Sequence, residues 1–187
     1  MSPFPSKINL DSIVQTTIQM IETEGVEKLS VNKLAERLGV KTPSLYRYVS
    51  GKTELLLAVN EATYQALFEA ITPVLEIPGD TQTKILTVAC EYRNFALANP
   101  VAYGLVYTNT MPELRPDESQ LVQGALPFQG LMAEVAGEAN ALTALRGLLA
   151  LIHGFVMLEL AGQLRRGGDL EAAFVRSVEA YIAGWGT

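Results

Sequence analysis

A chain of 187 residues that is 49% apolar and 18% charged is long enough to bury a core and is not composed like a disordered protein. Its single cysteine, Cys90, excludes an intramolecular disulfide. No basic segment followed by an apolar run opens the chain, and its most apolar stretch, 147–158, is shorter than the roughly 20 residues that cross a bilayer. These features predict a cytoplasmic protein without a transmembrane helix.

Almost every segment between glycine and proline breaks has helical rather than alternating apolar periodicity, which predicts an all-α protein. We expect Pro127 to interrupt the helix that contains it, residues 111–116 to form an exposed loop, and Gly167-Gly168 to form a tight turn. The predicted helices are 9–24, 30–38, one beginning at Thr42, 54–74, 81–98, 100–108, 119–136, 139–165 and 170–183.

The region 29–56 has the pattern of two short helices joined at a glycine and followed by a third. Ser30 can cap the first helix, which Gly39 ends. Thr42-Pro43 is a start signal for the second, because proline is tolerated at the first helical positions. Leu45 and Val49 lie on one face of that helix and point inward. The pattern predicts a helix-turn-helix, a device for reading DNA.

Positive charge is concentrated in this region. Residues 28–52 contain six lysine and arginine residues against one glutamate, a net charge of +5, so the rest of the chain carries −11. A basic module in an otherwise acidic protein is typical of a surface that binds phosphates.

The segment Leu45-Tyr46-Arg47-Tyr48-Val49-Ser50-Gly51-Lys52-Thr53-Glu54-Leu55-Leu56 resembles the end of the N-terminal three-helix module of the tetracycline-repressor (TetR) family of transcriptional regulators. The resemblance covers about residues 8–60. It implies a DNA-binding domain at 1–56, a ligand-binding and dimerisation domain at 57–187, and a repressor that a small, largely apolar effector releases from its operator. The positions implied for DNA contact are Asn32, Lys41, Thr42, Pro43, Ser44, Tyr46, Arg47, Tyr48 and Lys52.

The resemblance also implies particular roles. Lys52 would bind a phosphate at the start of the fourth helix, and Arg47 would contact a guanine. Tyr48 stands where many family members have histidine, so a phosphate contact there would come from a phenolic hydroxyl. Asn32 would either contact an adenine or face solvent.

The helix expected at 139–165 is apolar around much of its circumference. Such a helix is buried on several sides, either in a dimer, where it and helix 170–183 form a four-helix bundle with a second copy, or as a central core helix. Gly147, Gly154 and Ala161 at seven-residue spacing would permit close approach. Residues 149–162 also resemble the His-Gly-containing helix of one TetR C-terminal subtype.

In this family the fourth to eighth helices surround the effector. Aromatic residues with few polar groups would suit an apolar ligand, although aromatics at helical spacing also build cores. His153 is either a ligand contact or a core or interface histidine. The candidate ligand-binding residues are Tyr64, Phe68, Arg93, Tyr103, Tyr107, His153 and Met157, together with Tyr92, Phe95 and Phe128.

Two other classes of function fit the sequence less well. An enzyme would have to build its site from one cysteine and one histidine, Cys90 and His153, without a glycine-rich phosphate loop, and a zinc site would have to rely on carboxylates. We therefore expect no catalytic site, no metal and no cofactor. A helical protein-binding module without DNA function would have little use for the +5 region.

Overall fold

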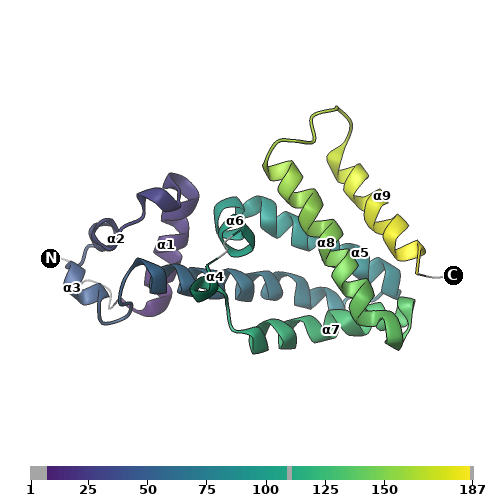
Figure 1. Cartoon of the computed structure of the whole chain (residues 1–187), viewed down its shortest axis with the longest axis horizontal. Helices are drawn as coiled ribbons and strands as arrows, with labels where there is room; N and C mark the ends of the chain where they lie inside the picture. The colour runs from purple at the N-terminus through teal and green to yellow at the C-terminus, as the bar shows by residue number, and fades with distance from the viewer. Residues whose placement is uncertain (1–7, 109–110, 186–187) are drawn as a thin grey trace. The chain divides into compact units, whose positions relative to one another are not determined.

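The computed structural model describes residues 8–108 and 111–185. The first residues of the expected DNA-binding domain, 1–7, lie outside this description, as do 109–110 and 186–187. The described residues contain no strand, so the all-α prediction is confirmed (Figure 1). The α-helices are α1 Leu10–Glu24, α2 Val31–Arg37, α3 Thr42–Leu45, α4 Lys52–Ile71, α5 Thr81–Ala98, α6 Pro100–Thr108, α7 Glu118–Ala136, α8 Ala141–Leu160 and α9 Leu170–Ala183. Short 3-10 helices are η1 Val26–Lys28, η2 Thr72–Glu76, η3 Pro112–Leu114 and η4 Glu138–Asn140.

Local side chains begin and end the first helices. Asn9 and Ser12 cap α1 reciprocally, each side chain accepting the other residue's backbone N–H, at 2.8 and 3.1 Å. The Ser30 hydroxyl accepts the Lys33 N–H at 3.3 Å, which confirms it as the cap of α2. Gly39 follows α2 with φ +67°, a conformation that favours glycine, so the predicted turn is also confirmed.

The described helices pack as two compact units. The first unit comprises residues up to Gln65 together with Asn99–Asp117. It therefore contains α1 to α3, most of α4, α6 and η3. The second unit comprises Ala66–Ala98 and the residues from Glu118 onward, with α5, α7, α8 and α9.

Segment 99–117 is part of the core of the first unit. Ala102 and Leu114 belong to the same buried cluster as the apolar residues of α1 to α4. The Glu22 carboxylate of α1 accepts the first free N–H groups of α6, from Val101 at 3.1 Å and Ala102 at 2.8 Å. The Asn60 amide of α4 donates to the Leu114 carbonyl at 2.7 Å. These contacts attach α6 and η3 to the N-terminal helices.

Two predictions about proline were wrong. Residues 111–116 do not form a simple exposed loop, because η3 lies within them and Leu114 is only 3% exposed. Helix α7 runs through Pro127 without interruption. Phe128 and Met132 are buried just beyond that proline, and their packing holds the helix although one backbone hydrogen bond is lost.

The predicted bounds of α5, α6 and α9 match the structure, but α8 is shorter than expected. It ends at Leu160, since Gly162 adopts φ +61°. Residues 161–169 then form a longer connection than the tight turn expected at Gly167-Gly168 (Figure 1).

Helix α8 combines buried and exposed apolar side chains. Leu148, Ile152 and Val156 are buried in the second unit, while Leu149 and Leu158 are 39% and 44% exposed. Gly147 makes room for a side chain of α9 in the same chain. A Cβ at this position would overlap the Tyr181 hydroxyl, which donates to the Ala144 carbonyl at 2.8 Å. At Gly154, by contrast, an added Cβ would meet nothing within 4 Å.

One helical segment is longer than the apolar stretch on which the expectation of no transmembrane helix rested. Residues 138–160 form a helical segment that is long and apolar enough, by length and composition, to cross a membrane, and a third of its most apolar window is buried in the fold. Core helices of proteins outside membranes meet the same criterion.

Candidate DNA interface and effector region

Helix α3 and the turns that follow it, residues 42–49, have an inner face and an outer face. Leu45 and Val49 are 0% and 2% exposed and belong to the core of the first unit. Tyr46 is 54% exposed, and Pro43 and Arg47 are exposed beside it. The α-helix proper ends at Leu45, and residues 46–48 continue as turns. A buried stripe with a polar, aromatic outer face is the arrangement that a reading helix requires.

The start of α2 lies against the start of α3. The Thr42 hydroxyl donates to Oδ1 of Asn32 at 3.1 Å. Asn32 is exposed and Thr42 is half-buried. Residues from both helices therefore share one polar surface with Lys41, Pro43 and Ser44.

Two predicted phosphate contacts have partners inside the chain. The Tyr48 hydroxyl donates to the Ile8 carbonyl at 2.8 Å, and Lys52 Nζ donates to the Val26 carbonyl at 2.9 Å. Tyr48 thereby contacts the backbone two residues before α1, and Lys52 contacts the backbone at the first residue of η1. Both side chains are half-buried, and their partners were not foreseen from the sequence.

The charge of this surface is lower than the sequence count suggests. Arg37 forms an ion pair with Glu24 of α1, with 2.8 Å between NH1 and Oε1. Glu24 lies outside residues 28–52, so the count of +5 omitted it. Lys28, Lys33, Lys41 and Arg47 are exposed and lie in the same module.

A carboxylate stabilises the start of α4, beside Lys52. Glu54 accepts the Ser50 N–H at 2.6 Å, and this hydrogen bond lowers the pKa of the Glu54 carboxyl. The interaction orders the turn between α3 and α4. It therefore helps to place α3 on the end of the long fourth helix.

The candidate effector residues divide between the two units. In the first unit, the Tyr107 ring lies 4.6 Å from the Tyr103 ring and 5.7 Å from the Tyr64 ring, centroid to centroid. Tyr103 is fully buried, whereas Tyr64 and Tyr107 are half-buried. Burial raises the pKa of the Tyr64 hydroxyl. These three rings form one aromatic group on α4 and α6.

The second unit holds Phe68, Arg93, His153 and Met157. The Phe68 ring stacks with Phe128, 6.4 Å between centroids, and packs so closely on Gly124 that an added Cβ would lie 2.6 Å from it. His153 and Met157 are half-buried on α8.

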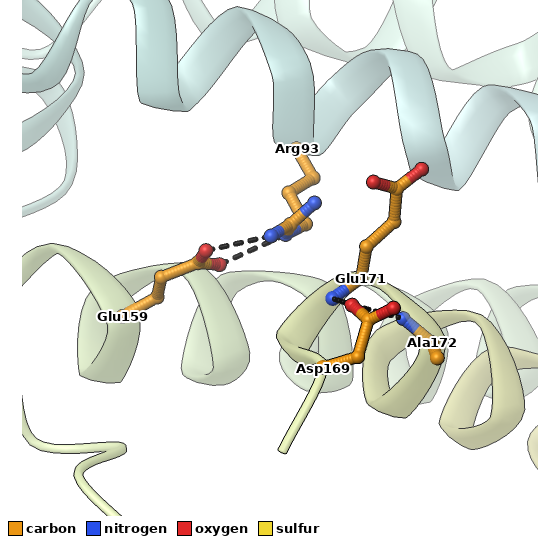
Figure 2. A network of polar contacts seen from close by, with 5 residues as sticks. All are labelled: Arg93, Glu159, Asp169, Glu171 and Ala172. Carbon is orange, nitrogen blue, oxygen red and sulfur yellow. Dashed lines mark hydrogen bonds and ion pairs between the residues drawn. The ribbon is translucent and has the colours of Figure 1, made fainter. Parts of the chain in front are cut away.

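Arg93 has a carboxylate partner within the chain. Its Nε and NH2 groups donate to the two carboxylate oxygens of Glu159 at 2.8 and 2.6 Å, which ties α5 to α8 (Figure 2). Its Cζ lies 5.5 Å from the centre of the Phe174 ring on α9. The pair with Glu159 raises the pKa of Arg93. Beside this pair, Asp169 caps α9 by accepting the N–H groups of Glu171 and Ala172 (Figure 2).

His153 should make the free energy of unfolding depend on pH. Burial lowers the pKa of His153 from its usual value near 6.5. The unfolded chain then binds the proton more readily, so the free energy of unfolding decreases as the pH falls through about 6.5. We expect His153→Gln to remove this component, as measured by urea unfolding between about pH 5 and pH 8. An unchanged slope in the variant would contradict this assignment.

Several of these partners carry no signal in the sequence. Glu22, Glu24 and Glu159 read as ordinary helix-surface glutamates. Glu22 meets α6 across 79 residues, and Glu159 meets Arg93 across 66. The one signal in the sequence was Arg93 itself, because an arginine on an otherwise apolar helix requires a counter-charge.

The inner stripe and outer face of α3, beside α2 and with lysines around them, define a helix-turn-helix DNA-binding protein. Comparison with known proteins agrees. Residues 13–59 match the model of the bacterial regulatory proteins of the tetR family, and residues 85–181 match the tetracyclin repressor-like C-terminal domain. The chain belongs to the TetR family of transcriptional regulators, and it is a DNA-binding regulator rather than an enzyme.

Two relatives and two solved structures illustrate the likeness. An uncharacterised HTH-type transcriptional regulator of Mycobacterium tuberculosis is 30% identical, with 96% of this chain and 83% of the relative covered. The tetracycline repressor protein class C of Escherichia coli is 31% identical over 50% of this chain and 42% of its own. A TetR variant of Acinetobacter baumannii in complex with minocycline has a TM-score of 0.72 and 26% identity, covering 95% and 96% of the two chains. The transcriptional regulator FadR of Bacillus subtilis, in complex with stearoyl-CoA, has a TM-score of 0.70 and 18% identity, covering 96% of this chain and 100% of that one.

Proposed function

We propose that this regulator is a cytoplasmic homodimeric repressor that binds a pseudo-palindromic operator and leaves it when a small, largely apolar effector binds. The outer face of α3 carries the proposal, because its exposed side chains sit over a buried stripe that fixes their direction. The proposed DNA-binding domain is 1–56, and the proposed ligand-binding and dimerisation domain is 57–187. The proposed DNA contacts are Asn32, Lys41, Thr42, Pro43, Ser44, Tyr46, Arg47, Tyr48 and Lys52.

Dimerisation through α8 and α9 is supported by the apolar side chains that α8 leaves exposed. Leu142, Leu149 and Leu158 are each about two-fifths exposed, at 43%, 39% and 44%. The open space at Gly154 would let a second helix approach closely. A two-fold dimer presents two α3 helices, so its half-sites repeat at about one helical turn, roughly 34 Å, or a multiple of it.

The effector proposal is supported by the aromatic candidates and by two structural neighbours, whose ligands are minocycline and stearoyl-CoA. The proposed ligand contacts are Tyr64, Phe68, Arg93, Tyr103, Tyr107, His153 and Met157. Effector would favour a conformer in which α4 carries the two reading helices out of register with successive major grooves. Effector must then bind less tightly to the protein–operator complex than to the free protein.

Selection of bound sequences from a random duplex pool tests the proposal. The expected result is a pseudo-palindromic sequence whose affinity falls steeply with salt, because phosphate contacts release counterions. The selected operator then allows effectors to be screened by release of DNA. Failure to enrich any sequence at low salt, with protein whose native mass spectrum shows no bound small molecule, would contradict the DNA-reading role of α3.

Lys52 and Arg47 should differ in what they contribute to DNA binding. Lys52→Ala should weaken binding to operator and random DNA alike and reduce the salt slope by about one per half-site. Arg47→Ala should cost about 1–3 kcal/mol per contact and relax preference at particular base pairs. Salt titrations on operator and random duplexes measure both effects. Equal losses on both DNAs for both variants would refute this division of roles.

A further inference from the structure

Asn60 of α4 carries a hydrogen-bond acceptor that no donor among the described residues satisfies. The side chain is 0% exposed, and its NH2 group donates to the Leu114 carbonyl of η3 at 2.7 Å. A carbonyl only accepts, so this bond fixes which end of the amide is the NH2 group and which end is the oxygen. Oδ1 of Asn60 is therefore a buried acceptor to which no described residue donates.

The other buried polar side chains of the first unit are satisfied within their own helices. Among its described residues these are Thr17 and Thr63, and neither they nor Asn60 are charged. Each threonine hydroxyl donates to the carbonyl four residues earlier, at 2.7 Å, so the proton of Thr63 is not available to its neighbour Asn60. An unsatisfied buried acceptor lowers stability, and folded proteins satisfy nearly all such groups through the chain, water or a ligand.

The face of α4 that carries Asn60 also carries part of the aromatic group. Tyr64 lies one turn farther along the helix, and residues four apart have Cβ atoms about 6 Å from each other. Asn60 contacts η3 and Tyr64 contacts Tyr107 of α6, so both side chains face segment 99–117. Tyr64 and Tyr107 are half-buried, so part of each remains accessible from solvent. A small molecule that lies against these rings would be close to Asn60.

We propose that Asn60 is the polar contact of an effector site on this face of α4, and that the ligand is an uncharged, largely apolar molecule whose hydroxyl or N–H group donates to Oδ1. The donor group follows from the unsatisfied acceptor. The lack of charge follows from the buried polar side chains described above, because none of them could neutralise a buried charge. This inference rests on the proposed effector function and adds to it a residue that the sequence did not indicate.

Matched pairs of probes test the assignment on the full-length protein. One pair is β-naphthol and its methyl ether, and the other is n-octanol and methyl heptyl ether. Within each pair the apolar body is closely similar and the ether keeps an oxygen, but only the hydroxyl compound can donate a hydrogen bond. We expect calorimetric titration of wild type to show about fivefold to tenfold tighter binding of the hydroxyl compound, the order of one neutral hydrogen bond.

Two variants and one measurement on wild type assign that preference to Asn60. Asn60→Leu removes the acceptor at similar size, and it should bind both members of a pair alike. Thr63→Val is the matched control, because it removes a buried hydroxyl from the same helix and should keep the preference. Asn60→Leu also leaves the Leu114 carbonyl without its donor, so wild type is examined by NMR as well. The side-chain amide signal of Asn60 should shift with β-naphthol and stay unchanged with its methyl ether.

Equal affinities of wild type within both pairs would mean that Oδ1 is satisfied by water, and they overturn the assignment. Binding of none of the four probes overturns it too, as does a preference that persists in folded Asn60→Leu. The selection of operator sequences is scored separately. An enriched operator together with equal affinities overturns this assignment alone, whereas a preference for the hydroxyl compounds without any enriched operator supports the site and contradicts the proposed DNA-binding function.

Discussion

Arg93→Ala should lower the free energy of unfolding by about 3–5 kcal/mol, because it leaves the Glu159 carboxylate buried without its counter-charge. The two side chains are only 10% and 15% exposed, and both guanidinium hydrogen bonds to the carboxylate would be lost. The contact of Arg93 with the Phe174 ring would be lost as well. Urea unfolding at one fixed protein concentration measures the effect, since the stability of a dimer depends on concentration.

The chain offers a matched control for this experiment. Arg37 and Glu24 form an ion pair of similar length, but their side chains are 46% and 33% exposed. Arg37→Ala should therefore cost no more than about 1 kcal/mol. Replacing both partners of the buried pair, as in Arg93→Met with Glu159→Leu, should restore most of the lost stability, because no unpaired charge remains. Equal losses of unfolding free energy for Arg93→Ala and Arg37→Ala would show that the buried pair does not stabilise the packing of α5 against α8.

Tyr103→Ala should destabilise the protein by about 3–5 kcal/mol if the ring is core, as its complete burial indicates. The same residue is a candidate effector contact, so the result decides between the two roles left open by the sequence. A ring that lines an unfilled pocket would leave a smaller loss on truncation, because less packing surrounds it. Thermal or urea unfolding without effector gives the answer.

Two controls accompany Tyr103→Ala. Tyr103→Phe keeps the ring and its contact with the Tyr107 ring, so it should retain most of the stability. Tyr46→Ala removes an equally large side chain that is 54% exposed, and its effect should stay within about 0.5 kcal/mol. A stability of Tyr103→Ala close to that of Tyr46→Ala would assign Tyr103 to the effector region rather than to the core.

Signals that act within a few residues were reliable in this protein. The Ser30 cap, the Gly39 turn and the Thr42-Pro43 start lie where the sequence places them, because caps and turns depend on the backbone next to them. Whether a proline interrupts its helix was harder to predict from the sequence. Pro127 lies inside α7 because buried neighbours hold the helix around it, a tertiary effect that local propensity does not contain.

The candidate DNA surface could be located from the sequence, but the hydrogen-bond partners of its side chains could not be predicted. The order of apolar positions places Leu45 inward and Arg47 outward, since a helix turns by about 100° per residue. The bond from Thr42 to Asn32 depends on how α3 crosses α2, and the bond from Lys52 to the Val26 carbonyl spans 26 residues. Both change which hydrogen-bonding atoms remain for DNA.

Periodicity, capping and charge are properties of neighbouring residues, so the all-α class, the helix-turn-helix at 29–56 and the positive charge gathered there follow from the sequence. Which groups pair depends instead on how the helices pack. Arg93 binds Glu159, and Glu22 holds the start of α6, across 66 and 79 residues. Such partners are selected by the packing of whole helices, in which burying a charge requires a counter-charge at one particular place.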